Sequence, residues 1–139
     1  MPEDGPSLLL EFRELFEELG TTDGYVKLQP MKRSSTTRAD NEKLPPVSLY
    51  KVIINDPADR AELGLSSIDN RIYRVWGGAI EPTGLLETTE NAWLSAMIGG
   101  GGVIEGTRLF SLQDYQRGFS VGDTVMQWYL ITSALKISR

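Results

Sequence analysis

The run 124–135 constrains the fold more than any other part of the chain. It reads TVMQWYLITSAL, carries no charged side chain, and is rich in the β-branched and aromatic residues that favour strands. Alternation places Val125, Tyr129, Ile131, Leu135 and Ile137 on one face and Met126, Trp128, Leu130 and Ala134 on the other. A strand with two apolar faces is covered on each side and paired along both edges. The stretch 119–137, entered through turn residues 121–123, therefore predicts a long central strand.

The composition excludes several kinds of chemistry. The chain has 139 residues, the size of one domain, and contains neither cysteine nor histidine. Disulfides, zinc–thiolate sites, thiol catalysis and imidazole-dependent triads are therefore excluded. An enzyme of this composition would depend on carboxylates, lysine, tyrosine or serine, so we expect a non-enzymatic protein that holds no cofactor and no metal ion.

Charge is unevenly distributed along the chain. The net charge of −5 disfavours nonspecific binding to nucleic acid or to an anionic membrane. Residues 1–18 carry six acidic side chains and one arginine, whereas residues 32–43 carry four basic and two acidic side chains. A solvated helix face explains the acidic stretch, and a pair of complementary patches for head-to-tail contact between copies is the alternative. The candidate interface residues are Lys32, Arg33, Arg38, Lys43, Leu9, Leu10, Glu14, Glu17 and Glu18.

The first half of the chain predicts a helix, a strand and a long arm. Apolar residues at i, i+3, i+4 and i+7 predict an amphipathic helix over 7–19, with Leu9 and Leu10 widening its apolar stripe. Residues 25–29 alternate as a strand that Pro30 ends. The polar stretch 32–46 has no hydrophobic period and predicts an extended loop or arm.

The second half alternates strands with short helices. Strands are predicted over 47–54 and 70–76, with a short helix over 58–63 that Asp56 and Pro57 begin. A helix is predicted over 88–98, then short apolar pieces at 103–105 and 108–110. A cap-like Ser111-Leu112-Gln113-Asp114 predicts a brief helix through Gln116 that ends at Gly118.

Four groups of residues are candidate sites. The glycine run 99–102 lacks the Lys-Ser/Thr of a phosphate loop and lies between a helix and a strand, so it favours a hinge or a close backbone approach. The available carboxylates, in no recognisable motif, are Glu81, Glu87, Glu90, Glu105, Asp114 and Asp123. The aromatic residues suit either core and subunit contacts or a ligand cup: Trp76, Trp93, Trp128, Tyr25, Tyr50, Tyr73, Tyr115 and Tyr129. Arg71, Arg74 and Arg108 are candidates for contact with a partner's carboxylates.

The layout resembles the small head–tail joining (neck or connector) proteins of tailed bacteriophages. The similarity rests on the helix LLEFRELFEELG (9–20), the strand YVKLQP (25–30), the long polar insertion and the terminal strand entered through FSVGD (119–123). It implies a β-barrel core with extended loops, in a ring between portal and tail, without catalytic residues.

We therefore expect a single α+β domain, mainly β, forming a barrel or small sandwich with the N-terminal helix packed outside. The expected function is that of a structural subunit in an oligomeric particle, with copies of itself and other structural proteins as partners. A capsid decoration or tail protein, a small-ligand-binding barrel and a carboxylate enzyme are the alternatives. Without a basic leader or a membrane-length apolar run, a virion or cytoplasmic location is expected, with no membrane or sequence-specific nucleic acid as partner.

Overall fold

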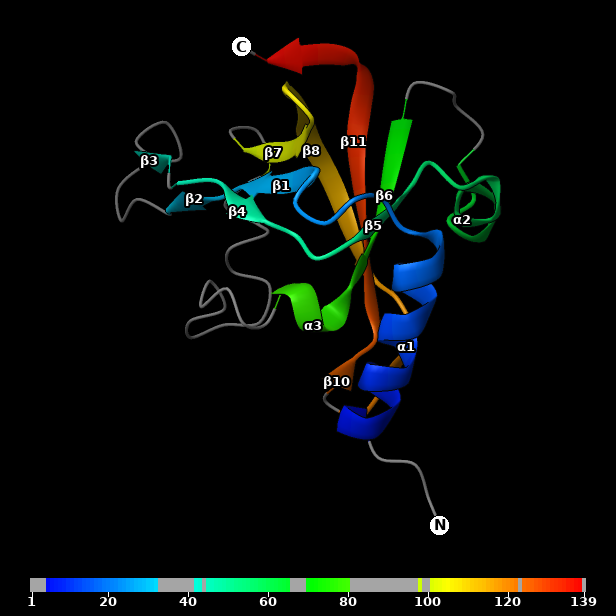
Figure 1. Ribbon diagram of the computed structural model, residues 1–139. Coiled ribbons are helices and arrows are strands. Elements are labelled where there is room, and N and C mark those ends of the chain that lie inside the picture. Colours follow the sequence, from blue (N-terminus) through cyan, green and yellow to red (C-terminus); the bar gives the residue numbers. More distant parts are fainter. Residues whose placement is uncertain are drawn as a thin grey trace.

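The structure is a computed structural model that describes residues 5–32, 42–43, 45–65, 70–80, 98, 101–122 and 124–138 (Figure 1). Its helices are α1 (Gly5–Leu19), α2 (Pro57–Glu62) and the short α3 (Gly77–Ile80). Its strands are β1 (Val26–Gln29), β2 (Met31–Lys32), β3 (Glu42–Lys43), β4 (Val47–Ser48), β5 (Val52–Ile54), β6 (Asn70–Trp76), β7 (Gly102–Glu105), β8 (Arg108–Arg117), β9 (Ser120–Val121), β10 (Thr124–Val125) and β11 (Gln127–Ser138).

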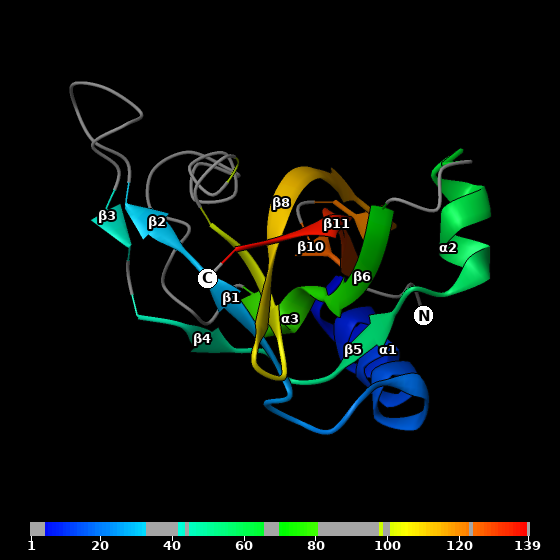
Figure 2. The ribbon, with the colours of Figure 1, turned by 90° about the horizontal axis from the view of Figure 1, so that it is seen from above.

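The fold is α+β and mainly β, as predicted. Seven strands form one antiparallel sheet in the order β4-β1-β7-β8-β11-β6-β5. The sheet curls on itself into a half-barrel, which is seen along its length in Figure 2. Two short ladders, β2 with β3 and β9 with β10, stand outside this sheet.

Strand β11 is the central strand that its apolar run predicts. It pairs with β6 along one edge and with β8 along the other. Trp128 and Leu130 point into the core and are nearly inaccessible, and Tyr129 and Ile131 on the other face are also buried. The strand begins later than predicted, however, because the residues before it form the β9–β10 hairpin.

The brief helix predicted between Ser111 and Gln116 is wrong, because this segment belongs to β8. The strand continues to Arg117, which pairs with Trp128 of β11. The cap-like sequence is a local preference, and pairing with the buried central strand β11 outweighs it.

The strand predicted over 47–54 is two strands at opposite edges of the sheet. β4 pairs with β1, and β5 pairs with β6. Between them the Leu49 amide donates to the Val26 carbonyl at 3.0 Å, so the crossing segment stays bonded to β1. The chain therefore passes across the open side of the half-barrel between these two strands.

The core fills the inside of the curl. Inward-facing residues from five strands are inaccessible to solvent, among them Leu28, Val52, Tyr73, Val103 and Leu130. Helix α1 packs outside, against β5, β6 and α3. The Trp76 indole Nε1 donates to the Leu9 carbonyl at 2.8 Å, and the Arg13 guanidinium lies over the Tyr50 ring. The N-terminal helix is therefore confirmed, beginning at Gly5 and not at Ser7, and these contacts hold it outside the barrel.

The remaining predicted elements are found in part. The short helix α2 has Asp56 as its N-cap, accepting from the Ala58 amide at 3.0 Å, and Pro57 at its first turn. β1 and β6 lie where alternation predicts them. Residues 31–32 and 42–43 pair as β2 and β3, so the base of the predicted arm is a hairpin. Residues 33–41 and 44 of the predicted arm 32–46 lie outside the described residues, as does the predicted helix 88–98 except Ile98.

Candidate functional site

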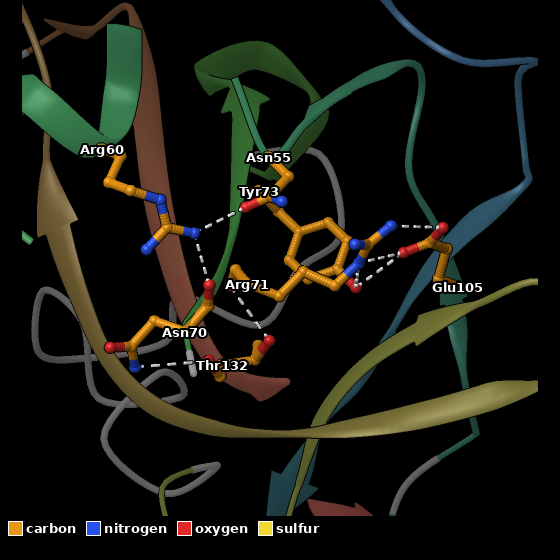
Figure 3. A network of polar contacts seen from close by, with 7 residues as sticks. All are labelled: Asn55, Arg60, Asn70, Arg71, Tyr73, Glu105 and Thr132. Atoms are coloured by element: carbon orange, nitrogen blue, oxygen red, sulfur yellow. Dashed lines mark hydrogen bonds and ion pairs between the residues drawn. The ribbon is translucent and has the colours of Figure 1, made fainter. Parts of the chain in front are cut away.

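One end of the half-barrel, here called the mouth, holds a cluster of three polar side chains (Figure 3). Arg71 donates from Nε and Nη2 to the two oxygens of Glu105, at 2.6 and 2.9 Å. The Tyr73 hydroxyl donates to Glu105 Oε1 at 2.9 Å and accepts from Arg71 Nε at 3.1 Å. Glu105 therefore accepts three hydrogen bonds, two of them from a cation.

The mouth cluster shifts the ionisation of all three groups. Burial alone would raise the pKa of Glu105, but the hydrogen bonds from Arg71 and Tyr73 outweigh it and hold that pKa below its ordinary value. The hydrogen bond to Glu105 raises the pKa of Arg71. Burial, with the nearby Glu105 carboxylate, raises the pKa of Tyr73 far above its ordinary value. The cluster is a charged pair with a neutral phenol.

A cavity of about 530 Å³ opens beside the mouth cluster. Its lining residues come from β6, from the start of β1 and from the β7–β8 hairpin: Tyr25, Arg71, Glu105, Gly106, Thr107, Arg108 and Phe110. Gly106 and Thr107 form a two-residue turn between paired Glu105 and Arg108, and Gly106 has the positive φ of 66° that such turns require. The Gly106 amide donates to the Tyr25 carbonyl at 3.0 Å, which fixes this turn against β1.

The cavity carries an excess of positive charge. Glu105 is neutralised by Arg71, whereas the Arg108 side chain is exposed and forms no ion pair within the described part of the chain. Two aromatic rings complete the lining. Tyr25 is 46% exposed, and Phe110 lies under the Arg71 guanidinium at 5.7 Å from its ring centre. The cavity thus has a mostly polar lining that offers one available cation and one exposed aromatic ring, that of Tyr25.

A second polar cluster ties α2 to the outer face of β6. Arg74 Nε donates to Asp59 at 3.1 Å and Nη2 donates to Asp56 at 3.3 Å. Burial raises the pKa of Asp59, although Arg74 opposes that shift. Arg60 donates to the Asn55 side chain at 2.9 Å and to the Asn70 carbonyl at 2.6 Å (Figure 3). These contacts lie within one domain and hold α2 in place.

The predicted aromatic and arginine sites separate into distinct places. Of the aromatic residues that were candidates for a ligand cup, only Tyr25 lines the cavity, and Tyr73 lies buried beside it. Trp128 is in the core with Tyr115, and Trp76 packs with Tyr50 under α1. Trp93 lies outside the described residues. Arg71 and Arg74 pair within the chain, and among the described residues Arg108 is the one of the three candidate arginines without an ion pair.

The predicted interface residues lie on two sides of the molecule. Leu10, Glu14, Glu17 and Glu18 are exposed on α1, whereas Leu9 is half-buried and its carbonyl accepts from Trp76. Glu17 forms an ion pair with Arg13 at 3.7 Å. Lys32 and Lys43 lie in β2 and β3, and Arg33 and Arg38 lie outside the described residues. In Figures 1 and 2 the β2–β3 hairpin and α1 stand on opposite sides of the sheet.

Among the candidate carboxylates, Glu105 is bound by Arg71, and Asp114 is exposed and accepts from the Tyr115 amide. Glu81, Glu87, Glu90 and Asp123 lie outside the described residues. Within the part of the chain that the structure describes, no three acidic residues come together as a possible metal site. No helix among the described segments is both long and apolar enough to cross a membrane.

The cavity was not predicted from the sequence. Glu105, Arg71 and Tyr73 are predicted separately, as a carboxylate, a partner-contact arginine and an aromatic residue, and nothing in the sequence brings them together. The one local signal was Gly106 between two short apolar segments, which is a hairpin pattern. Comparisons of the chain with protein-family models, with curated proteins and with solved structures found no match.

Proposed function

We propose that the protein is a non-enzymatic structural subunit that assembles head to tail into a ring or similar particle. The observation that carries this proposal is the position of its two oppositely charged segments, since α1 and the β2–β3 hairpin stand on opposite sides of the half-barrel (Figures 1 and 2). Complementary surfaces on opposite sides of one subunit favour a heterologous contact, which produces a closed ring when the rotation between copies closes.

The outer face of α1 has the composition of a contact surface. Leu10, Glu14 and Glu18 follow at i, i+4 and i+8, so they share the face that points away from the domain. Leu10 is 61% exposed and stands among carboxylates on that face. An apolar residue within an acidic face suits a partner that brings basic side chains around an apolar contact.

The particle that fits this proposal is a virion, with the head–tail connector of a tailed bacteriophage as the specific assignment. The support is the resemblance in layout together with the half-barrel, the external N-terminal helix and the hairpin at the base of the long polar segment. A capsid decoration or tail protein uses the same subunit properties. In each case the partners are further copies of the chain and other structural proteins of the particle.

The test is the mass in solution at micromolar concentration, measured by light scattering at low and high salt. We expect a multimer that dissociates as salt is added, because exposed charges are screened. Replacing Glu14 and Glu18 by lysine should abolish assembly, as should Lys43→Glu with Lys32→Glu. Mixing the two variants should restore assembly, because the basic α1 of one variant then meets the acidic hairpin of the other. Glu62→Lys, an exposed change of the same sign on α2, is the control that should leave assembly unchanged.

A monomer at both salt concentrations would contradict the self-assembly of this subunit. A multimer that is equally stable in all the variants would show that its contacts lie elsewhere on the surface. If the charge-reversed α1 variant fails to assemble and the charge-reversed hairpin variant does not restore its assembly, the hairpin is not part of the interface.

A further inference from the structure

We infer that the cavity at the mouth of the half-barrel binds a small organic anion, a carboxylate carried on a flat apolar body. The inference goes beyond assembly, because it concerns a cavity lined by β6, the residue before β1 and the β7–β8 hairpin, and not the α1 and β2–β3 surfaces. The volume of about 530 Å³ lies within the range of small-molecule sites, and barrel mouths are a usual place for them.

The charge of the lining selects an anion. Glu105 cannot attract a cation strongly, because Arg71 and Tyr73 already supply three hydrogen bonds to its oxygens. Arg108 is exposed at the cavity and has no ion-pair partner in the described segments. Its planar guanidinium matches a carboxylate, to which it can donate two parallel hydrogen bonds.

The exposed Tyr25 ring, in an otherwise mostly polar lining, favours a flat body on the ligand. The Tyr25 ring stands beside Gly106, where a Cβ atom would come within 3.3 Å of the tyrosine hydroxyl. Glycine at this position therefore leaves the ring in place and the space beside it open. Phe110 also lines the cavity, but its ring is only 7% exposed and lies under the Arg71 guanidinium, so Tyr25 is the main aromatic surface. A planar ligand could stack on Tyr25 while its carboxylate reaches Arg108.

The experiment compares three probes of the same shape on the full chain: 2-naphthoate, uncharged 2-naphthamide and cationic 2-naphthylmethylammonium. Affinities are measured by calorimetry, and the site is located from ¹H–¹⁵N NMR shifts. We expect naphthoate to bind with shifts at the Gly106 and Thr107 amides. The amide should bind about tenfold or more weakly, because a charge-assisted hydrogen bond is lost, and the cation should bind more weakly still.

Two variants test the role of Arg108. Arg108→Gln should weaken naphthoate binding about tenfold or more and bring it to the level of the amide. Arg117→Gln, the same change at the other end of β8, should leave binding unchanged. Equal affinity for the acid and the amide would overturn the proposal. So would undiminished binding to Arg108→Gln, shifts that map away from the β7–β8 turn, or no naphthoate binding at millimolar concentration. The comparison of probes on the unaltered protein stands even if a variant fails to fold.

Discussion

Glu105 and Arg71 meet at 2.6 Å although their strands, β7 and β6, are separated in the sheet by β8 and β11. In a flat sheet, strands three positions apart lie about 14 Å from each other. The ion pair therefore forms across the inside of the curl and depends on it. It joins the two walls of the half-barrel at the mouth, above the apolar core.

Acid should weaken the fold through Glu105. The folded-state pKa of Glu105 lies below the ordinary value of 4.5. The stability that ionised Glu105 contributes is therefore complete above pH 4.5 and is lost as the pH falls through the folded-state pKa. Glu105→Gln should lower the free energy of unfolding at neutral pH by about 1–3 kcal/mol and flatten its decline below about pH 5. Urea unfolding across pH measures both effects. Asp114→Asn, at an exposed carboxylate of β8, should keep the original profile.

Alkali should act through Tyr73. Because its folded-state pKa lies above the ordinary value of 10.0, its contribution is complete below that value and is lost as the pH rises towards the folded-state pKa. Tyr73 should be the last tyrosine to ionise in an ultraviolet absorbance titration. Tyr73→Phe should lower the free energy of unfolding by about 1 kcal/mol at neutral pH. In alkali the stability of this variant should decline less than that of the unaltered protein. Early ionisation of every tyrosine would contradict the buried position of Tyr73.

Two residues of α1 should respond very differently to truncation. Phe16 is fully inaccessible, so Phe16→Ala should lower the free energy of unfolding by about 3–5 kcal/mol through lost burial and a cavity. Leu10 is 61% exposed, so Leu10→Ala should change stability by no more than about 0.5 kcal/mol. Thermal and urea unfolding measure both values. A large loss of stability in Leu10→Ala would show that Leu10 packs within the domain, which would contradict its assignment to the interface.

Deletion of residues 34–43 should separate folding from assembly. It removes β3, which pairs only with β2 and takes no part in the seven-stranded sheet. We expect circular dichroism and the melting temperature to stay close to those of the full chain, while light scattering reports a monomer. Full assembly by the shortened chain would exclude this segment from the contact between copies.

Regular local patterns predicted individual elements well. The apolar spacing around Phe16 gave α1, Asp56-Pro57 gave the start of α2, and the alternation of 70–76 gave β6. The uncharged run gave a central strand because burial on both faces leaves no other place for it. These signals depend on neighbours in the chain, so they can be read from the sequence without knowledge of the topology.

Signals that depend on distant partners were missed. The cap-like Ser111–Asp114 sequence suggested a helix, but β11 supplied a strand partner that local preference does not reveal. The predicted strand 47–54 contains no glycine or proline to mark a break, although the chain changes edges there. The mouth cluster joins Glu105 to residues more than thirty positions earlier, so no local spacing marks it.

The crossing from β4 to β5 sets a limit on how far the sheet can open. From Ser48 to Val52 the chain takes four residue steps, which span at most about 14 Å when fully extended. The two edge strands of the sheet, β4 and β5, are therefore joined by a short covalent link. The sheet cannot flatten unless one of these strands detaches. Its curvature therefore survives rearrangement of the side chains inside it. In the proposed assembly, contacts through α1 and the β2–β3 hairpin would leave this curved sheet unchanged.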